Sequence, residues 1–166
     1  MKTLIRPGTL ADLKSFVAHR CSMFRDMDYG DEAGFARMTP EFRALLHRWL
    51  TTGQVRGWVA ERGGQVMGSA LMELKEALPS PLSPQSIRGY LFNVYVAPEA
   101  RGQGIARRFT EAALGEARKL ELDIVELHAS QDAEALYRSM GFEPTPELRL
   151  VLNPQFPKPG QWKNRR

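Results

Sequence analysis

The sequence predicts a single α/β domain built on one mixed β-sheet. Two strand-like segments flank the dipeptide Gly63-Gly64, which indicates a hairpin and therefore antiparallel neighbours. Further along, an apolar segment at 88–96, a long amphipathic helix and another apolar segment at 123–130 follow each other. That order is typical of a β–α–β unit, whose two strands run parallel. A length of 166 residues suits one domain.

The first third of the chain predicts a strand and two helices. Residues 4–9 read as a short strand, and Thr9 is a suitable N-cap for the helix that follows. Residues 25–35 mix Asp, Gly and Tyr without a helical period, which indicates a loop. A second helix is expected over 40–50, with Pro40 in its first turn.

The middle of the chain contains the segments that form most of the predicted sheet. The hairpin covers 58–76, and the Pro- and Ser-rich stretch 78–86 predicts a surface loop. The segment 88–96 is almost continuously apolar, which favours a central strand. A helix over 105–122 with one apolar face then leads to the strand at 123–130.

The last part of the chain predicts a short helix over 132–140, closed by Gly141, and a final strand over 148–152. The sequence contains no internal repeat. We therefore expect one domain over residues 1–153 and a basic, Pro-containing tail over 154–166.

Composition and charge limit the class of protein. The net charge of +4 equals the four basic residues of the last ten, which include no acid: Lys158, Lys163, Arg165 and Arg166. Because the rest of the chain is neutral, we expect no nucleic-acid partner; binding of nucleic acid through the tail is the alternative. Cys21 is the only cysteine, which excludes an internal disulfide and favours the cytoplasm. We expect no export signal and no membrane span.

The stretch VYVAPEARGQGIARRF, at 94–109, predicts an anion site. It leads from a strand through a Gly-spaced loop into the N-terminus of a helix, where backbone N–H groups lack intrahelical partners. Arg101, Arg107 and Arg108 add positive charge. The phosphate loop of nucleotide hydrolases is excluded because no Gly-Lys-Ser/Thr follows, and Arg107 stands where a dinucleotide fingerprint needs a small residue. The alternative is an ordinary β-to-α turn.

The pattern R-x-x-G-x-A in this stretch, Arg101 to Ala106, resembles the signature motif of the GNAT superfamily of acyl-CoA-dependent N-acetyltransferases. The segment ALYRSMGF at 135–142 resembles the second conserved block of that family, and the two blocks occur in the family's order. The resemblance implies a mixed, mostly antiparallel central sheet with a splayed parallel strand pair, flanked by helices. It also implies acetyl-CoA as cosubstrate, no metal, and a homodimer.

The resemblance assigns cofactor contacts by position. Pantetheine is expected to pair with the backbone of Val94, Tyr95 and Val96. The pyrophosphate is expected on the loop and first helical turn, at Arg101, Gly102, Gln103, Gly104, Ile105, Ala106 and Arg107. Ser130 stands where many members carry Asn; it can cap the helix that follows, but it reaches less far toward the cofactor.

Acetyl transfer needs an acid for the leaving thiolate and a base for the attacking amine. Tyr137 is the predicted acid, because in the family a Tyr at this place lies near the CoA sulfur; a packed aromatic is the alternative. Glu73 and His128 are the candidate bases, and each has a structural alternative as a paired or hydrogen-bonded side chain.

The acceptor is expected near Phe24, Met27, Tyr29 and Asn93. The alternatives are core packing for the apolar side chains and a solvent-facing position for Asn93. The sequence thus predicts an enzyme that transfers acetyl from acetyl-CoA to a primary amine of a small molecule or protein, by direct attack in a ternary complex. A CoA-binding sensor or regulatory module without transferase activity is the alternative.

Overall fold

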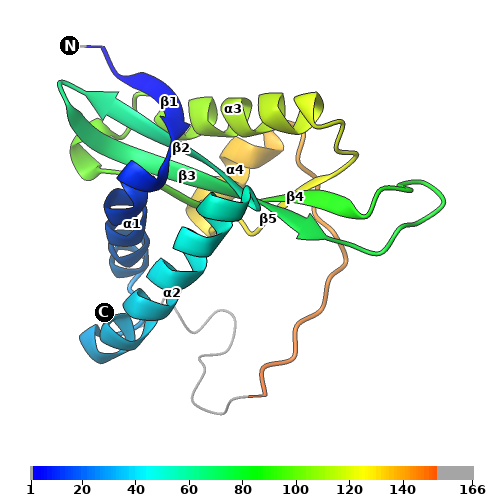
Figure 1. The fold of residues 1–166 in the computed structure, drawn as a ribbon, viewed down its shortest axis with the longest axis horizontal. Coiled ribbons are helices and arrows are strands. Elements are labelled where there is room, and N and C mark those ends of the chain that lie inside the picture. Colours follow the sequence, from blue (N-terminus) through cyan, green and yellow to red (C-terminus); the bar gives the residue numbers. More distant parts are fainter. Residues whose placement is uncertain (1, 153–166) are drawn as a thin grey trace.

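A computed structural model describes residues 2–152. Its sheet has five strands in the order β1-β2-β3-β4-β5 (Figure 1). The strands are β1 (Leu4–Gly8), β2 (Val55–Arg62), β3 (Gln65–Glu76), β4 (Ile87–Val96) and β5 (Val125–Leu127). Neighbours are antiparallel from β1 to β4, whereas β4 and β5 are parallel. The predicted mixed sheet, with one parallel pair joined by a crossover helix, is confirmed.

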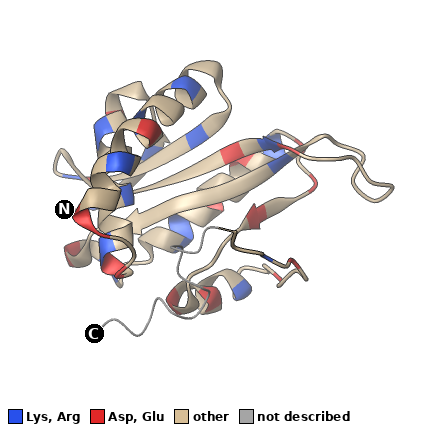
Figure 2. Cartoon of the chain, turned by 90° about the horizontal axis from the view of Figure 1, so that it is seen from below, with Lys and Arg blue, Asp and Glu red and all other residues tan. Residues whose placement is uncertain are grey.

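Helices cover both faces of the sheet. They are α1 (Leu13–Asp26), α2 (Glu32–Thr52), α3 (Ile105–Lys119) and α4 (Gln131–Arg138), with short 3-10 turns η1 (Leu10–Asp12) and η2 (Pro98–Ala100). Strand alternation sends Leu71 toward a cluster with α1 and α2, and the adjacent Met72 toward a cluster with α3 and α4. Charged residues of both signs are scattered over the helices (Figure 2).

The hairpin and the first cap form as predicted. Gly63 and Gly64 both adopt positive φ, at 58° and 79°, which the tight turn between β2 and β3 requires. The Thr9 hydroxyl accepts the Ala11 N–H at 3.3 Å, and the Asp12 carboxylate accepts the Thr9 N–H at 2.9 Å. This capping box opens η1, so α1 itself begins three residues later.

Strand β4 carries the distortion that creates room for a site. Its register against β3 shifts between Ser69 and Leu71, and Asn93 lies at φ 54°, so β4 bulges there. Parallel pairing with β5 covers only Gly89–Leu91, after which β5 ends and β4 continues to Val96. The sheet therefore opens beyond Leu91, and the implied splayed pair is confirmed.

The predicted second helix and the loop before it were wrong in extent. Helix α2 begins at Glu32 because the Asp31 carboxylate caps it, accepting the Gly34 N–H at 2.7 Å. Pro40 consequently lies inside α2 rather than in its first turn, where its ring removes one intrahelical hydrogen bond. Only residues 27–31 separate the two helices.

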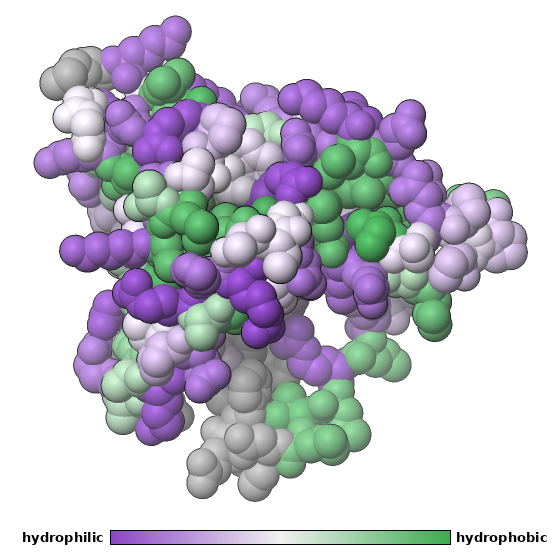
Figure 3. Space-filling view, viewed as in Figure 1, coloured by the Kyte–Doolittle hydropathy of each residue, from purple (hydrophilic) through white to green (hydrophobic). Residues whose placement is uncertain are grey.

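The predicted final strand was also wrong. Residues 148–152 have no regular secondary structure, and β5, which would have to offer them an edge, is only three residues long. Their leucines are exposed as a result: Leu148 by 100%, Leu150 by 83% and Leu152 by 85%. Apolar side chains accordingly gather below the sheet, on the segment that follows α4 (Figure 3). The predicted tail at 154–166 lies outside the described residues.

Candidate active site

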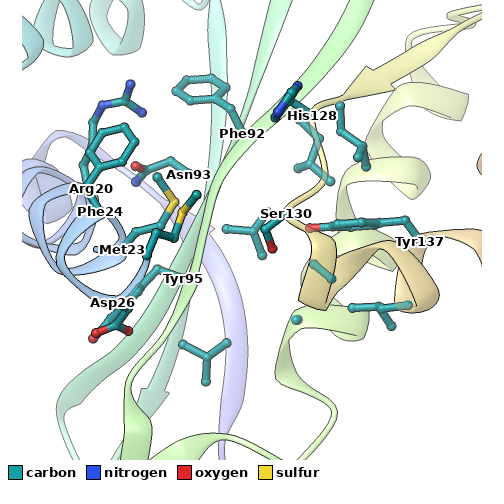
Figure 4. Close-up of a pocket in the computed structure, with 18 of the residues that line it drawn as sticks. Arg20, Met23, Phe24, Asp26, Phe92, Asn93, Tyr95, His128, Ser130 and Tyr137 are labelled. Carbon is teal, nitrogen blue, oxygen red and sulfur yellow. The ribbon is translucent and has the colours of Figure 1, made fainter. Parts of the chain in front are cut away.

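A cavity of about 950 Å³ lies where β4 and β5 separate, and α1, the loop after η2 and α4 also contribute to its wall (Figure 4). Nearly all of the predicted site residues line it: Phe24, Met27, Tyr29, Glu73, Asn93, Val94, Tyr95, Val96, Arg101, Gly102, Gly104, Ile105, Ala106, Arg107, His128, Ser130 and Tyr137. Gln103 is the exception; its side chain donates to the Glu99 carbonyl at 3.5 Å. One cavity thus joins segments that lie more than a hundred residues apart in the sequence.

The loop between η2 and α3 presents a run of unpaired backbone donors. Gly102 and Gly104 hold φ of 72° and 70°, which favour glycine, and a Cβ built on either would meet nothing within 4 Å. Within residues 2–152, the N–H groups of 102–107 donate to no protein acceptor, although the Arg101 N–H is bonded to the Pro98 carbonyl. The dipole of α3 adds partial positive charge, so the loop fits a diphosphate.

The arginines of this loop are less available than the sequence indicates. The Arg101 guanidinium pairs with Asp26 and donates to the Val96 carbonyl at 3.0 Å. Arg107 donates to the Ser139 hydroxyl at 2.6 Å, and Arg108 to the Thr3 carbonyl at 3.1 Å. The backbone of the loop is therefore its main source of free donors.

Tyr137 is held between the core and the cavity. It is 7% exposed, its ring meets Phe142 edge-on at 5.8 Å between centroids, and its hydroxyl points toward the cleft and Ser130 (Figure 4). The hydroxyl has no hydrogen-bond partner among the described residues. Burial raises the pKa of Tyr137, which keeps the phenol protonated at neutral pH. This arrangement suits a proton donor.

Three other polar side chains reach the cavity from the sheet and from the turn before α4. Ser130 occupies the N-cap position of α4, but its hydroxyl makes no cap bond, contrary to prediction; its carbonyl accepts from Ala133 and Glu134 at 3.0 Å. The Ser130 hydroxyl is therefore free to face the cleft. His128 is exposed just beyond β5, and Glu73 is half-buried on β3 opposite Tyr90.

The α1 side of the cavity is apolar and aromatic. Phe24 and Tyr29 pack at 5.2 Å between ring centroids, and Phe24 and Met27 are only half-buried at the cavity wall, so they do not belong to a closed core. Asn93 is 3% exposed rather than solvent-facing, and its amide donates to the Phe16 carbonyl at 3.3 Å. Its side-chain oxygen is buried and accepts no hydrogen bond from any residue between 2 and 152.

Sequence reasoning missed several residues of the wall, among them Arg20, Asp26, Tyr90 and Arg149. A signal existed for Arg20. Arg20 lies four positions after Phe16 and four positions before Phe24, so a charged side chain interrupts an apolar helix face. No local signal indicated that Asp26 pairs with Arg101, because that contact depends on how α1 packs beside the loop.

Fold and site together define a class of protein: an α/β domain whose sheet opens at a parallel strand pair and presents an anion-binding loop beside the opening, as an acyl-CoA-dependent transferase requires. Residues 22–142 match the acetyltransferase (GNAT) family model. The chain belongs to this family.

Relatives of known structure share the whole fold. The chain superimposes on a GCN5-related N-acetyltransferase from Ralstonia eutropha JMP134 with a TM-score of 0.85 and 33% identity, covering 91% of this chain and 99% of that one. A predicted acetyltransferase from Clostridium acetobutylicum, solved with acetyl-CoA, gives a TM-score of 0.84 at 24% identity, with 92% and 96% covered.

Similarity to curated proteins is confined to part of the chain. N-acetyltransferase 8 of Mus musculus is 39% identical over 99 residues, which cover 56% of this chain and 42% of that protein. N-acetyltransferase 8B of the same species is 38% identical over 91 residues, covering 53% and 38%. The chain thus spans about two fifths of the length of these relatives.

Residues 2–152 contain neither a membrane-spanning helix nor a cluster of metal ligands. No helix there is long and apolar enough to cross a membrane. In the same range, no group of three or more His, Cys, Asp or Glu side chains is placed to hold a metal ion.

Proposed function

We propose that this protein transfers an acetyl group from acetyl-CoA to a primary amine of a small molecule or protein, by direct attack in a ternary complex. The observation that carries the proposal is the run of free N–H groups at 102–107 beside the opened β4–β5 edge. Family membership and the named activities of the relatives support it.

In this proposal the loop holds the diphosphate of CoA, and the backbone of β4 at 94–96, which β5 does not cover, pairs with the pantetheine arm. Ser130, whose hydroxyl is not used as a cap, lies across the cleft and can donate to the same arm. When bound, acetyl-CoA supplies the acetyl group as a thioester. A backbone N–H near Val96 is the proposed donor to the thioester oxygen.

Tyr137 is the proposed general acid. Its phenol faces the cleft, has no competing partner among the described residues and is kept protonated by burial. It can therefore give its proton to the departing thiolate. Glu73 and His128 both line the cavity and are the two side chains proposed to accept the proton of the amine.

Direct attack is favoured because the chain has one cysteine and it is placed elsewhere. Cys21 is buried, its sulfur lies 3.5 Å from the Thr39 hydroxyl, and it is not part of the cavity wall. Covalent transfer through a thiol would require it to reach the thioester.

The experiment measures binding and turnover separately. Acetyl-CoA should raise the melting temperature, because a ligand that binds only the native state stabilises it. A panel of primary amines is then tested for release of free CoA thiol. Absence of a thermal shift contradicts the cofactor site; a shift without thiol release from any amine contradicts the transferase and favours a CoA-binding module.

A further inference from the structure

At the acceptor end of the cavity, a guanidinium group lies without an anionic partner. The side chain of Arg20, on α1, lines the cavity but makes no hydrogen bond and no ion pair with any residue from 2 to 152, and its Nε is buried. The other lining arginines near the cofactor loop differ: Arg101 pairs with Asp26, and Arg107 is bonded to Ser139. Arg20 is thus a cation whose hydrogen-bonding capacity is unused within the described part of the chain.

The surroundings fix this guanidinium in place but do not neutralise it. Its carbon lies 4.8 Å from the ring centroid of Phe24 and 4.6 Å from that of Phe42, so two aromatic faces hold it. Burial lowers the pKa of Arg20, and the groups that act on it electrostatically are Cys21, Tyr29 and Tyr90, none of them a carboxylate. An arginine nevertheless keeps its charge inside proteins.

A half-buried, charged group with five N–H donors is costly unless an acceptor meets it. A guanidinium matches a carboxylate in shape and can bind it through two parallel hydrogen bonds. Asn93 lies on the same side of the cavity, and its buried side-chain oxygen is also unpaired (Figure 4). A polar ligand is therefore needed here, beside the aromatic and sulfur-containing side chains that α1 contributes to the wall.

We propose that Arg20 is a specificity residue that binds a carboxylate on the acceptor, so that the acceptor is a carboxylate-bearing primary amine with an apolar or aromatic body. This inference rests on the proposed acetyltransferase function and narrows its substrate class. The aromatic body would lie against Phe24 and Met23, which line the same side.

The test compares two primary amines of nearly the same size, phenylalanine with its carboxylate and phenylalaninamide with a neutral carboxamide, in the wild type, Arg20→Lys and Arg20→Gln. The readout is the ratio of kcat/KM for the acid to that for the amide, because differences in intrinsic amine reactivity cancel between variants. Loss of a charge-assisted pair should lower this ratio about 10- to 100-fold in Arg20→Gln. Arg20→Lys keeps the positive charge but cannot form the two parallel hydrogen bonds of a guanidinium, so it should retain part of the preference for the acid.

A binding measurement keeps this inference separate from the proposed activity. N-acetylphenylalanine should raise the melting temperature of the wild type but not that of Arg20→Gln, and N-acetylphenylalaninamide should raise neither. If this pattern appears without turnover of any amine, the transferase proposal fails while the carboxylate site stands. If the acid binds no better than the amide to the wild type, or if Arg20→Gln keeps the preference, the inference is overturned.

Discussion

Replacing Tyr137 with Phe removes one oxygen atom and tests the proposed general acid directly. The ring packs edge-on against Phe142 and is 7% exposed, so its burial is retained in the variant. The hydroxyl has no hydrogen-bond partner within residues 2–152, so its loss leaves no buried donor or acceptor unpaired there. The free energy of unfolding is therefore expected to change by less than about 0.5 kcal/mol.

The effect on catalysis should be far larger. A positioned general acid typically contributes at least about 10²-fold to the rate. That factor corresponds to about 2.7 kcal/mol of transition-state stabilisation, against the near-zero effect on folding. The cofactor loop at 102–107 is untouched, so the Kd for acetyl-CoA should stay within about twofold of the wild type. The expected result is a loss of kcat without a loss of cofactor binding.

The assay is thiol release at saturating acetyl-CoA, paired with calorimetric titration of acetyl-CoA. Tyr90→Phe is the matched control, because it removes a hydroxyl from another tyrosine of the same cavity and no catalytic role is assigned to it. It should keep kcat close to that of the wild type. An undiminished kcat in Tyr137→Phe, or an equal loss in both variants, would refute the assignment of Tyr137 as the acid.

Two further predictions concern the loop and the core. Gly104→Val should weaken acetyl-CoA binding about tenfold or more. Gly104 holds φ 70°, where a β-branched residue is strained, and the valine side chain would occupy the open space beside the loop. The control is Gly115→Ala, because Gly115 lies on α3 with open space around its Cβ position. This variant should bind acetyl-CoA like the wild type, and its free energy of unfolding should rise by about 0.5–1 kcal/mol. Equal acetyl-CoA affinity in both variants contradicts the loop assignment. Burial lowers the pKa of His19 from 6.5 to about 4, so the unfolded chain takes up the proton first as the pH falls. The free energy of unfolding should therefore drop by on the order of 2 kcal/mol between pH 6.5 and 4 in urea titrations, and His19→Asn, which can still bond to Ser69, should lose most of that dependence.

Local sequence signals were most reliable where a single residue type has one structural use. Gly63-Gly64 predicted a tight hairpin because both positions need positive φ, and the apolar face of 105–122 predicted α3. The same kind of reasoning misplaced the start of α2. The sequence predicts that Asp31 belongs to a loop, but its carboxylate caps the helix nine positions before Pro40. Capping and loop-forming residues are the same residues, and only the packing of the following turn decides between them.

Strand prediction failed at 148–152 for a related reason. Alternating leucines favour a strand only if an edge is available to receive it, and the edge that β5 offers is only three residues long. Likewise, the sequence placed Arg101, Arg107 and Ser130 near the cofactor but not their partners. The packing of distant elements decides that Arg101 pairs with Asp26 and that Arg107 donates to Ser139. It also decides that the Ser130 side chain does not cap α4.

The order of elements, the Gly-spaced loop before α3 and the Tyr of the second block were all readable from the chain, because each depends on residues within a few positions of one another. Tertiary structure decided the opening of the sheet beyond Leu91 and the cavity that joins distant segments. It also left the guanidinium of Arg20 without a partner among residues 2–152. Each of these depends on groups that lack a partner in space. A sequence lists the groups that can pair, whereas the fold determines which of them remain unpaired and face a ligand.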